Sequence, residues 1–415
     1  MKRENTVPAS RVPATTITAG RATWFVVLLG IVSLFADMTY EGARGIIGPY
    51  LALLGASATV VGVVAGLGEL LGYALRLVSG RLADRTGRYW LVTICGYLVN
   101  LLAVPLLALT GHWQYAVLLM FAERVGKALR SPPRDAMLSF AGKTMGRGWG
   151  FALHEAMDQT GATIGPLLMA GVIAWKNGHI LQDYQFGFGL LLIPAVLSLG
   201  TLGLARVLFP NPRDLERRTP ELDVCGFAKP FWLYLAATAC VAAGFADYPL
   251  IAYHFQARAV VDGGWIPFFY ALAMAVDGGA ALVFGAVYDR RGMGVLIAAL
   301  LAGVLAAPLL FLGGFDSAVC GVVLWGVGMG AQESVMKAVV AAMSPVARRG
   351  SAFGIFNMSF GVFWFAGSAL MGVLYDVSIP ALVAFSVVVQ LLAVPLMLLV
   401  MRRHRASTDE GHDVK

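Results

Sequence analysis

Apolar runs separated by short polar segments recur along the whole chain. Each run is close to the ~20 residues that an α-helix needs to cross the hydrocarbon core of a bilayer. Transmembrane β-strands would be shorter and would alternate apolar with polar positions, which these runs do not. The pattern predicts twelve membrane-spanning helices, over residues 22–53, 57–79, 89–110, 114–132, 147–175, 186–208, 230–256, 265–288, 293–313, 318–343, 350–375 and 380–401.

One polar insertion divides these twelve spans into six and six. It is FPNPRDLERRTPELDVCGFAKP (Phe209 to Pro230), whose four prolines and mixed charges are typical of a linker. The predicted domains are a cytoplasmic tail at 1–21, a six-helix bundle at 22–208, a cytoplasmic linker at 209–229, a second six-helix bundle at 230–402 and a cytoplasmic tail at 403–415.

The two halves repeat each other. GRLADRTGR (Gly80 to Arg88) recurs as GAVYDRRGM (Gly285 to Met293), and Arg147-Gly148 with Phe151 and Gly165 recurs as Arg349-Gly350 with Phe353 and Gly367. The tripeptide FAD at 35–37 recurs at 245–247. Three matches in order at nearly one offset indicate two bundles that arose by duplication.

Composition agrees with a membrane protein, because 58% of the residues are hydrophobic and only 13% are charged. Soluble domains carry about 25% charged residues. Basic residues outnumber acidic ones by 31 to 24, but they gather in short loops between apolar runs, which argues against nucleic-acid binding. The basic residues before Trp24 precede an apolar run that we interpret as an uncleaved first span rather than a signal peptide.

The basic residues also predict the orientation. With the N-terminus inside, the inner loops and tails hold 25 of them, whereas the outer loops hold only Lys176 and Arg258. This asymmetry predicts a multi-pass protein of the inner (plasma) membrane with both termini in the cytoplasm. The inner count includes Lys127, Arg130 and Arg134, which lie near or just beyond the inner end of the fourth span.

Catalytic and cofactor signals are weak. Cys95, Cys225, Cys240 and Cys320 form no CxxC pair, and the six His residues are dispersed, so we expect no metal site and no cofactor. No G-x-x-x-x-G-K-S/T motif for nucleotide binding is present, so energy for any transport would come from an ion gradient.

The repeated loop carries a family resemblance. GRLADRTGR resembles the signature loop of the major facilitator superfamily, G-x-L-a-D-r-x-G-r, and the second copy lacks the final arginine. Glycine permits close helix approach and tight turns, and a carboxylate can cap a helix or pair with arginine, so the motif suits a conformational contact; an ordinary basic turn is the simpler interpretation. The candidate residues of this motif are Gly80, Asp84, Arg85, Gly87, Arg88, Gly285, Asp289, Arg290 and Gly292. The resemblance implies an all-α membrane protein of the MFS fold, with two six-helix bundles related by pseudo-twofold symmetry.

Two further segments resemble motifs of that superfamily. Gly161, Gly165 and Pro166 in the fifth span look like the core of its antiporter motif, G-x-x-x-G-P-x-x-G-G, although Met169-Ala170 stand where two glycines would be. A small-residue packing face explains the same spacing. In the fourth span, Arg124 resembles a buried arginine of the family. The following Arg130, Arg134 and Asp135 suit either a cytoplasmic gate or a solvated loop.

Charges inside the spans follow a pattern of three. Spans 3, 6, 9 and 12 contain no Asp, Glu, Lys or Arg, with Arg206 at the end of span 6 counted with the inner side, and span 11 contains none either. A charge facing lipid costs ~2.5–3.5 kcal/mol, so these spans can face lipid all round. The family resemblance implies the same outer scaffold and a cavity lined by spans 1, 4, 7 and 10.

Span 1 places Asp37, Glu41 and Arg44 on one helical face. Two carboxylates one turn apart resist ionising together, so one can carry a proton near neutral pH, while Arg44 balances the other or holds an anionic substrate group. The predicted coupling and substrate residues are Asp37, Glu41, Arg44, Arg124, Glu155, Asp158 and Asp247. For each of them, a structural ion pair is an equally open interpretation.

The sequence therefore predicts a secondary transporter that works by alternating access, most simply proton-coupled efflux of a small, partly apolar molecule. Proton-coupled uptake, a membrane-embedded enzyme and a transport-inactive sensor are the alternatives. The expected partners are a small-molecule substrate, protons and the lipid bilayer, with no nucleic acid, and we expect a monomer.

Overall fold

The computed structural model describes residues 19–145, 147–176, 181–210, 227, 229–344 and 349–409. The N-terminal half consists of α1 (Ala19–Leu53), α2 (Ala58–Thr86), α3 (Tyr89–Leu106) with η1 (Leu107–Leu109), α4 (Trp113–Met145), α5 (Arg147–Lys176), α6 (Leu181–Leu190) and α7 (Leu192–Leu208). The C-terminal half consists of α8 (Lys229–Gly244), α9 (Tyr248–Ala257), α10 (Trp265–Arg291), α11 (Gly294–Val304), α12 (Ala306–Leu312), α13 (Phe315–Ala331), η3 (Gln332–Met336), α14 (Lys337–Ala342), α15 (Arg349–Val377) and α16 (Ile379–Asp409).

These elements make twelve membrane-spanning segments, as the apolar pattern predicts, because α6–α7, α8–α9, α11–α12 and α13–η3–α14 each form one interrupted span. Ten segments of the described chain are long and apolar enough to cross a bilayer by composition alone. The other two are α4 and α5, in which charged and polar residues interrupt the apolar sequence. Most of the linker expected at 209–229 lies outside the described residues, and α16 continues seven residues beyond the boundary expected at 402.

The prediction of a loop after residue 132 was wrong. Helix α4 runs through Pro132 and Pro133 to Met145, so Lys127, Arg130 and Arg134 lie on a membrane helix. A proline has no N–H to donate to the carbonyl four residues earlier. The hydroxyl of Ser79 on α2 replaces the donor that Pro132 lacks, since it bonds the Ala128 carbonyl at 2.8 Å. The helix therefore continues where the sequence suggested an end.

A different interruption divides the seventh span. The chain leaves the helix at Phe245–Asp247 and re-enters at Tyr248, with a proline in the first turn of α9. The Gly244 carbonyl accepts from Ser386 at 2.6 Å and from Gln390 at 2.9 Å, and the Ala246 carbonyl accepts from the indole of Trp325 at 2.8 Å. Side chains of α16 and α13 thus satisfy backbone groups that hydrocarbon could not.

The packing of the two halves reflects the sequence repeat. Gly165 of α5 lies against the Met38 carbonyl of α1, and its repeat partner Gly367 of α15 lies against the Ala243 carbonyl of α8. A Cβ atom at either glycine would overlap the facing backbone. Glycine at these positions therefore allows the fifth span of each half to pack directly on the first.

Each of the repeated signature segments ends a helix at a glycine with positive φ, although ψ is 9° at Gly87 and −155° at Gly292. Gly87 and Gly292 both have φ of 66°, and their N–H groups bond the carbonyls of Ala83 and Tyr288, each at 2.8 Å. The motif is mostly helix rather than loop, since Gly80, Asp84 and Arg85 lie in α2 and Gly285, Asp289 and Arg290 lie in α10. The side chains of Asp84 and Asp289 lie outside the described part of the structure.

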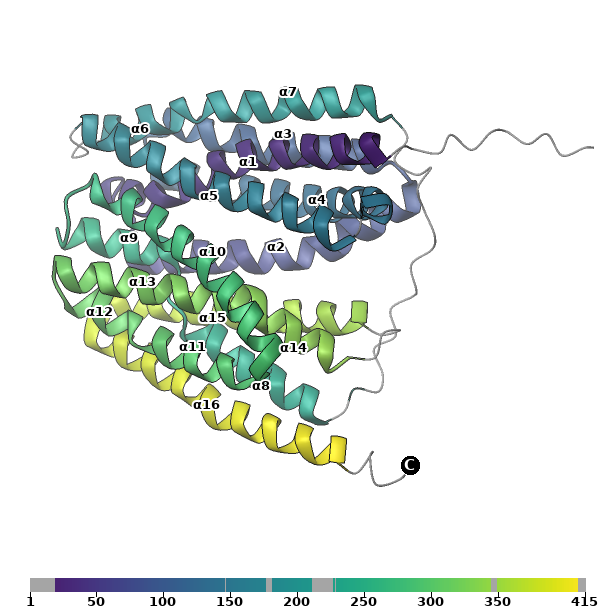
Figure 1. Cartoon of the computed structure of the whole chain (residues 1–415). Coiled ribbons are helices and arrows are strands. Elements are labelled where there is room, and N and C mark those ends of the chain that lie inside the picture. Colours follow the sequence, from purple (N-terminus) through teal and green to yellow (C-terminus); the bar gives the residue numbers. More distant parts are fainter. Residues whose placement is uncertain are drawn as a thin grey trace, which may run out of the picture.

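The scaffold helices are the ones that the charge pattern selects. In Figure 1, α7 lies at one edge of the molecule and α16 at the opposite edge, and α1 begins at the same end of the bundle at which α16 ends. Exposed apolar side chains on α3, α7 and α16 include Leu102, Ile193 and Leu391. Between the edges, α2 packs on α15, α5 packs on α10, and α1 packs on α9, so these three pairs join the halves.

Candidate functional site

A cavity of about 410 Å³ lies between the two halves. Its walls come from α1, α2, α4 and α5 on one side and from α10, α13, η3, α14 and α15 on the other. The carboxylates that line it are Asp37, Glu41, Glu69, Glu155, Asp158, Asp277 and Glu333, and the cations are Arg44, Arg76, Lys127 and Lys337. This is the largest concentration of charge within the described membrane helices.

The lining differs from what the family resemblance implies for the seventh span. No residue of α8 or α9 is among those lining this cavity, whereas α2, α5, α10 and α15 contribute instead. Asp247, at the break between α8 and α9, is only 1% exposed. Its carboxylate is occupied by Arg44 and by the indole of Trp364, which explains why it does not reach the cavity surface.

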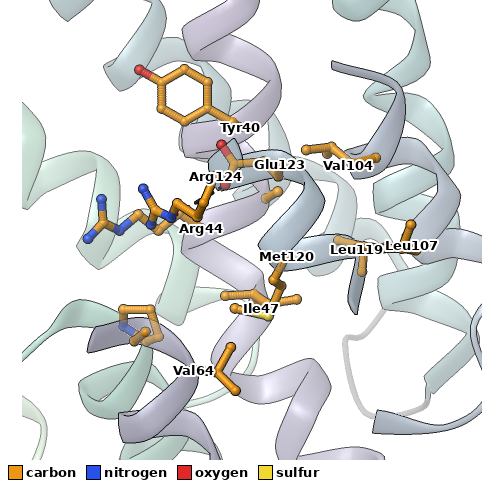
Figure 2. Close-up of a pocket in the computed structure, with 14 residues that line it drawn as sticks. Tyr40, Arg44, Ile47, Val64, Val104, Leu107, Leu119, Met120, Glu123 and Arg124 are labelled. Carbon is orange, nitrogen blue, oxygen red and sulfur yellow. Dashed lines mark ion pairs between the residues drawn. The ribbon is translucent and has the colours of Figure 1, made fainter. Parts of the chain in front are cut away.

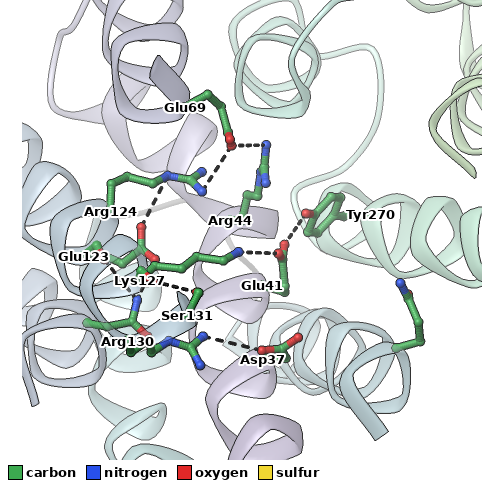
Figure 3. Close-up of polar contacts among 12 residues, drawn as sticks. Asp37, Glu41, Arg44, Glu69, Glu123, Arg124, Lys127, Arg130, Ser131 and Tyr270 are labelled. Carbon is green, nitrogen blue, oxygen red and sulfur yellow. Dashed lines mark hydrogen bonds and ion pairs between the residues drawn. The ribbon is translucent and has the colours of Figure 1, made fainter. Parts of the chain in front are cut away.

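Charged and polar side chains of α1 and α4 form a ladder (Figure 3). Along α1 the positions are Ser33, Asp37, Glu41 and Arg44, and along the antiparallel α4 they are Arg134, Arg130, Lys127 and Arg124. Both sets recur every three or four residues, which places each on one helical face. We call this arrangement the α1–α4 ladder.

The two middle rungs hold the carboxylates of span 1. Asp37 Oδ1 lies 3.8 Å from Arg130 Nη2, and Glu41 Oε1 lies 3.8 Å from Lys127 Nζ. Both separations are longer than a close charge-assisted hydrogen bond of ~2.7–2.9 Å. Glu41 also accepts a hydrogen bond from the hydroxyl of Tyr270 on α10, so one carboxylate connects α1 to both α4 and the opposite half.

Arg130 is the most deeply buried cation of the ladder. It is 1% exposed, its guanidinium lies 4.4 Å from the ring centre of Tyr97, and Gly96 of α3 packs against its backbone. The alternative of a solvated loop for this residue was therefore wrong. A buried cation in a membrane helix is expensive unless it is paired, so Asp37 and Arg130 depend on each other for their stability.

Arg44 does not balance Asp37 or Glu41, and this part of the prediction was wrong. Its Nη2 lies 3.0 Å from Asp247 and 3.3 Å from Glu69, and Glu69 in turn lies 3.1 Å from Arg124. The guanidinium points away from the α1 carboxylates because Glu69 of α2 bridges two arginines, as Figure 3 shows. The Arg44–Asp247 contact joins the two halves directly.

The remaining predicted carboxylates lie on α5. Asp158 lies 3.5 Å from His154, whose ring shares a hydrogen bond of 3.0 Å with the Ser33 hydroxyl, and Arg134 donates to that hydroxyl at 2.9 Å. Glu155 is exposed in the cavity and accepts from Gln159 at 3.5 Å. Asp158 therefore belongs to the ladder's first rung, and Glu155 stands apart from it.

Gly161 and Gly165 set the position of α5 behind these carboxylates. Gly161 lies against the Leu34 carbonyl of α1, one turn before the contact that Gly165 makes with Met38. The segment that resembles an antiporter motif therefore brings α5 next to Asp37 and Glu41. The contacts agree with the interpretation of the motif as a small-residue packing face. The same packing places Asp158 beside the ladder.

The wall from the C-terminal half has a different chemistry. Asp277 of α10 is 2% exposed, and its Oδ1 has no hydrogen-bond partner among the described residues. Gly330 of α13 packs against the backbone of Asp277, and Glu333 follows three residues later in the π-helical turn η3. No ion pair within 4.0 Å joins Asp277 or Glu333 to a cation in the described chain, including Lys337.

Aromatic rings of α15 continue this wall. Phe353, Phe356, Phe360 and Trp364 line the cavity at helical spacing. Successive ring centres lie 5.7 Å apart for Phe356 and Phe360 and 5.5 Å apart for Phe360 and Trp364. We call these four residues the α15 aromatic stripe.

A smaller cavity of about 40 Å³ lies among α1–α4 and η1, with Pro249 of α9 as its lining residue from the C-terminal half (Figure 2). Its walls are mostly apolar, with Ile47, Val64 and Leu119 among them, and its polar end is formed by Glu123 and Arg124. Tyr40 and Arg44 line both cavities, so they separate the two spaces.

Sequence reasoning missed Lys127, Arg130, Asp277 and Glu333 as members of the site. The spacing of Arg124, Lys127, Arg130 and Arg134 is itself a helical face, and this signal was available in the sequence. The proline pair concealed it. Asp277 and Glu333 carried no such signal, because only packing of α10 against α13 brings them together.

Known proteins resemble this chain over most of its length. The family model described as Major Facilitator Superfamily matches residues 29–334 and again residues 264–414. An uncharacterized protein of Mycobacterium tuberculosis is 41% identical over 379 residues, which cover 90% of this chain and 92% of the relative. The multidrug resistance protein MdtH of Yersinia enterocolitica is 27% identical over 186 residues, covering 42% of this chain and 45% of that protein.

The fold also matches a solved structure. The crystal structure of the nucleoside transporter NupG superposes with a TM-score of 0.70 at 13% identity, and the match covers 91% of this chain and 98% of that chain. Twelve membrane helices, a charged cavity between two repeated halves and a full-length family match lead to one conclusion: this chain belongs to the major facilitator superfamily of secondary transporters, which carry small molecules across membranes and are not enzymes.

Proposed function

We propose that this transporter exports a small, partly apolar molecule in exchange for protons. The observation that carries the proposal is the pair Asp37 and Glu41, which line the cavity one helical turn apart. Each faces a cation at 3.8 Å rather than at close hydrogen-bond distance. A carboxylate held this loosely in a membrane interior can exchange its counter-ion for a proton.

Protonation of Glu41 would act on the contact between the halves. When ionised, Glu41 attracts Lys127 of its own half and accepts from Tyr270 of the opposite half. A hydrogen bond to an ionised acceptor is roughly twice as strong as a neutral one. Loss of the charge therefore weakens the link to α10 and favours the alternative arrangement of the halves.

The Arg44–Asp247 pair would be the second link that the cycle breaks. It connects α1 with the break before α9 at 3.0 Å, in surroundings where Asp247 is 1% exposed. A buried pair of this kind is stable only while both partners stay together. We propose that it stabilises the arrangement seen here and separates when the other side of the cavity closes.

Export rather than uptake is supported by two features. The segment Gly161, Gly165 and Pro166 resembles the family's antiporter motif and packs behind the ladder. The partial relative MdtH is named a multidrug resistance protein, and drug resistance by a transporter is most simply efflux. Uptake by proton symport is the second candidate, and it is favoured by the presence of carboxylates on both walls, which would allow substrate and proton to bind together.

The orientation remains part of this proposal. After Lys127, Arg130 and Arg134 are assigned to α4, the loops and tails predicted as inner still hold nearly all the basic residues. The beginning of α1 and the end of α16 lie at the same end of the bundle (Figure 1). We propose that this end faces the cytoplasm of an inner membrane. Reporter fusions after Lys176 and Arg258 should lie outside and a fusion after Arg217 inside.

The repeated segments that end at Gly87 and Gly292 are proposed as conformational contacts. Asp84→Asn should leave insertion intact and slow transport, and Asp289→Asn should be milder, because the second segment lacks the final arginine. Transport at the wild-type rate in the Asp84 variant would remove that role.

The proposed exchange is tested in proteoliposomes under an imposed pH gradient. Three dyes that do not titrate, one cationic, one neutral and one anionic, are assayed so that the result does not depend on the charge of the substrate. Antiport predicts that a transported dye accumulates in vesicles that are acidic inside, and symport predicts accumulation in vesicles that are acidic outside. If no dye accumulates above the level of protein-free vesicles under either gradient, proton coupling is contradicted.

A further inference from the structure

The C-terminal wall of the cavity contains acidic groups that the proposed coupling does not use. Only 2% of the surface of Asp277 is exposed, and its Oδ1 has no hydrogen-bond partner in the described structure. A buried polar atom without a partner is costly and calls for an explanation, and a bound ligand or proton that completes it is one. Glu333 stands next to it, in a π-helical turn, a distortion that is frequent at functional sites.

The charges around this pair favour a positive ligand. Lys337 lies one turn beyond Glu333 but is exposed, and Arg76 lies on α2 with its guanidinium 5.5 Å from the ring centre of Tyr73. Glu155 of α5, which also lines the cavity, adds a further negative charge. In the opposite wall, by contrast, Arg44 and Lys127 already face carboxylates. Among the lining groups without a Lys or Arg ion-pair partner in the described chain, carboxylates outnumber cations by four (Glu155, Asp158, Asp277, Glu333) to two (Arg76, Lys337), so the balance of unpaired charge is negative.

The α15 aromatic stripe supplies the second half of the recognition. Phe356 and Trp364 are each 4% exposed and turn their remaining surface toward the cavity. Aromatic faces attract cations, most strongly when both are shielded from water, and they also pack against apolar bodies. Trp325 of α13 also lines this cavity and adds to its apolar surface.

We propose that this wall binds an organic cation with an apolar or aromatic body, the positive group meeting Asp277 and Glu333 and the body packing on the α15 aromatic stripe. This assignment of substrate class rests on the proposed export function and deepens it. Binding of the cation also supplies the partner that Asp277 lacks. The α1–α4 ladder then serves the protons, and the C-terminal wall serves the substrate.

Equilibrium binding of radiolabelled tetraphenylphosphonium to the purified full-length protein tests the proposal. The protein is placed in nanodiscs of zwitterionic lipid at one pH, with no gradient, and tetraphenylborate serves as an anion of the same shape. We expect the cation to bind at least tenfold more tightly than the anion. Asp277→Asn combined with Glu333→Gln should weaken cation binding at least tenfold, and Phe360→Leu should weaken it about threefold.

Asp316→Asn, in the exposed first turn of α13, is the matched control and should bind like the wild type. Size-exclusion profiles and thermal unfolding establish that each variant is folded. Equal binding of cation and anion, absence of cation binding to the wild type at millimolar concentration, or unchanged binding in the Asp277/Glu333 variant would overturn the proposal. Because no gradient is applied, a failure of proton coupling leaves this result intact. Conversely, pH-driven transport of only the neutral or the anionic dye would overturn the substrate class and not the coupling.

Discussion

The two walls of one cavity, built from repeated halves, have opposite chemistry. On the N-terminal wall, Asp37 and Glu41 each face a cation of α4, and Arg44 is held between two carboxylates. On the C-terminal wall, Asp277 and Glu333 have no ion pair within 4.0 Å in the described chain and lie beside an aromatic stripe. Duplication preserved the backbone packing of Gly165 and Gly367, while the side chains of the two walls diverged.

The difference indicates how two tasks can be divided in a symmetric scaffold. On the N-terminal wall a proton competes with a fixed cation for each carboxylate, whereas unpaired acids that share a cavity with aromatic rings suit a cationic ligand. The variants below measure this contrast directly.

The largest effect on stability should come from breaking a pair on the N-terminal wall. Arg130→Met leaves Asp37 buried without its cation, and removal of one partner of a buried pair costs about 3–5 kcal/mol. The free energy of unfolding in detergent measures this cost, and Asp37→Asn in the same chain should recover most of it. Asp277→Asn should cost less than about 1 kcal/mol, because it removes no ion pair. Equal losses in the free energy of unfolding for Arg130→Met and Asp277→Asn would contradict the proposed difference between the two walls.

The shared backbone packing should respond alike in both halves. Gly165→Val and Gly367→Val each place a side chain against a facing carbonyl, and overpacking of this kind costs about 1–3 kcal/mol. Gly171→Val, in open space on α5, is the control and should leave the unfolding temperature unchanged. A loss confined to one half would show that the repeat does not extend to packing.

The contact between the halves should control access to buried positions of α9. In a background without native cysteines, Ala252→Cys reports opening, since Ala252 is fully buried against Gly48 of α1. Arg44→Gln or Asp247→Asn should increase its rate of maleimide modification at least fivefold, as a coupling of 1 kcal/mol or more requires. Asp262→Asn, exposed after α9, should leave the rate unchanged, and unchanged rates in all three variants would contradict the link.

The smallest effect should come from the helix ends that carry the sequence signature. Gly87→Ala and Gly292→Ala both force a Cβ atom onto a backbone with φ of 66°, which costs about 1–2 kcal/mol. Thermal unfolding should show the larger loss for Gly292→Ala, because its ψ of −155° places it in a region that is essentially restricted to glycine, whereas the ψ of 9° at Gly87 is left-handed helical. A loss at Gly87 alone would indicate that the second copy has relaxed.

The fold was largely predictable from the sequence, because membrane helices are selected by long apolar runs and by the positions of charges. The exceptions have physical causes. Pro132 suggested an end to the fourth span, but the hydroxyl of Ser79, distant in sequence, satisfies the carbonyl that the proline leaves free. The direction of Arg44 depends on Glu69 of α2, and no pattern within span 1 reveals that neighbour.

The candidate site was predictable only in part for the same reason. The face of Asp37, Glu41 and Arg44 followed from helical spacing, whereas their partners depend on which helices pack together. Asp277 and Glu333 lie in different spans, so spacing within one helix could not reveal their proximity. It also could not reveal that the α15 aromatic stripe lines the same cavity.

The most direct test of the proposed coupling is pH-driven dye accumulation in proteoliposomes containing Glu41→Gln, or Asp37→Asn combined with Arg130→Met so that the buried Arg130 cation is not left alone, measured beside dye counterflow at equal pH. The account predicts that both variants exchange dye at near the wild-type rate, since the substrate wall is intact, and that accumulation falls at least tenfold because no proton is carried. Full accumulation in both variants would contradict it, and the two carboxylates would then be structural partners of Arg130 and Lys127.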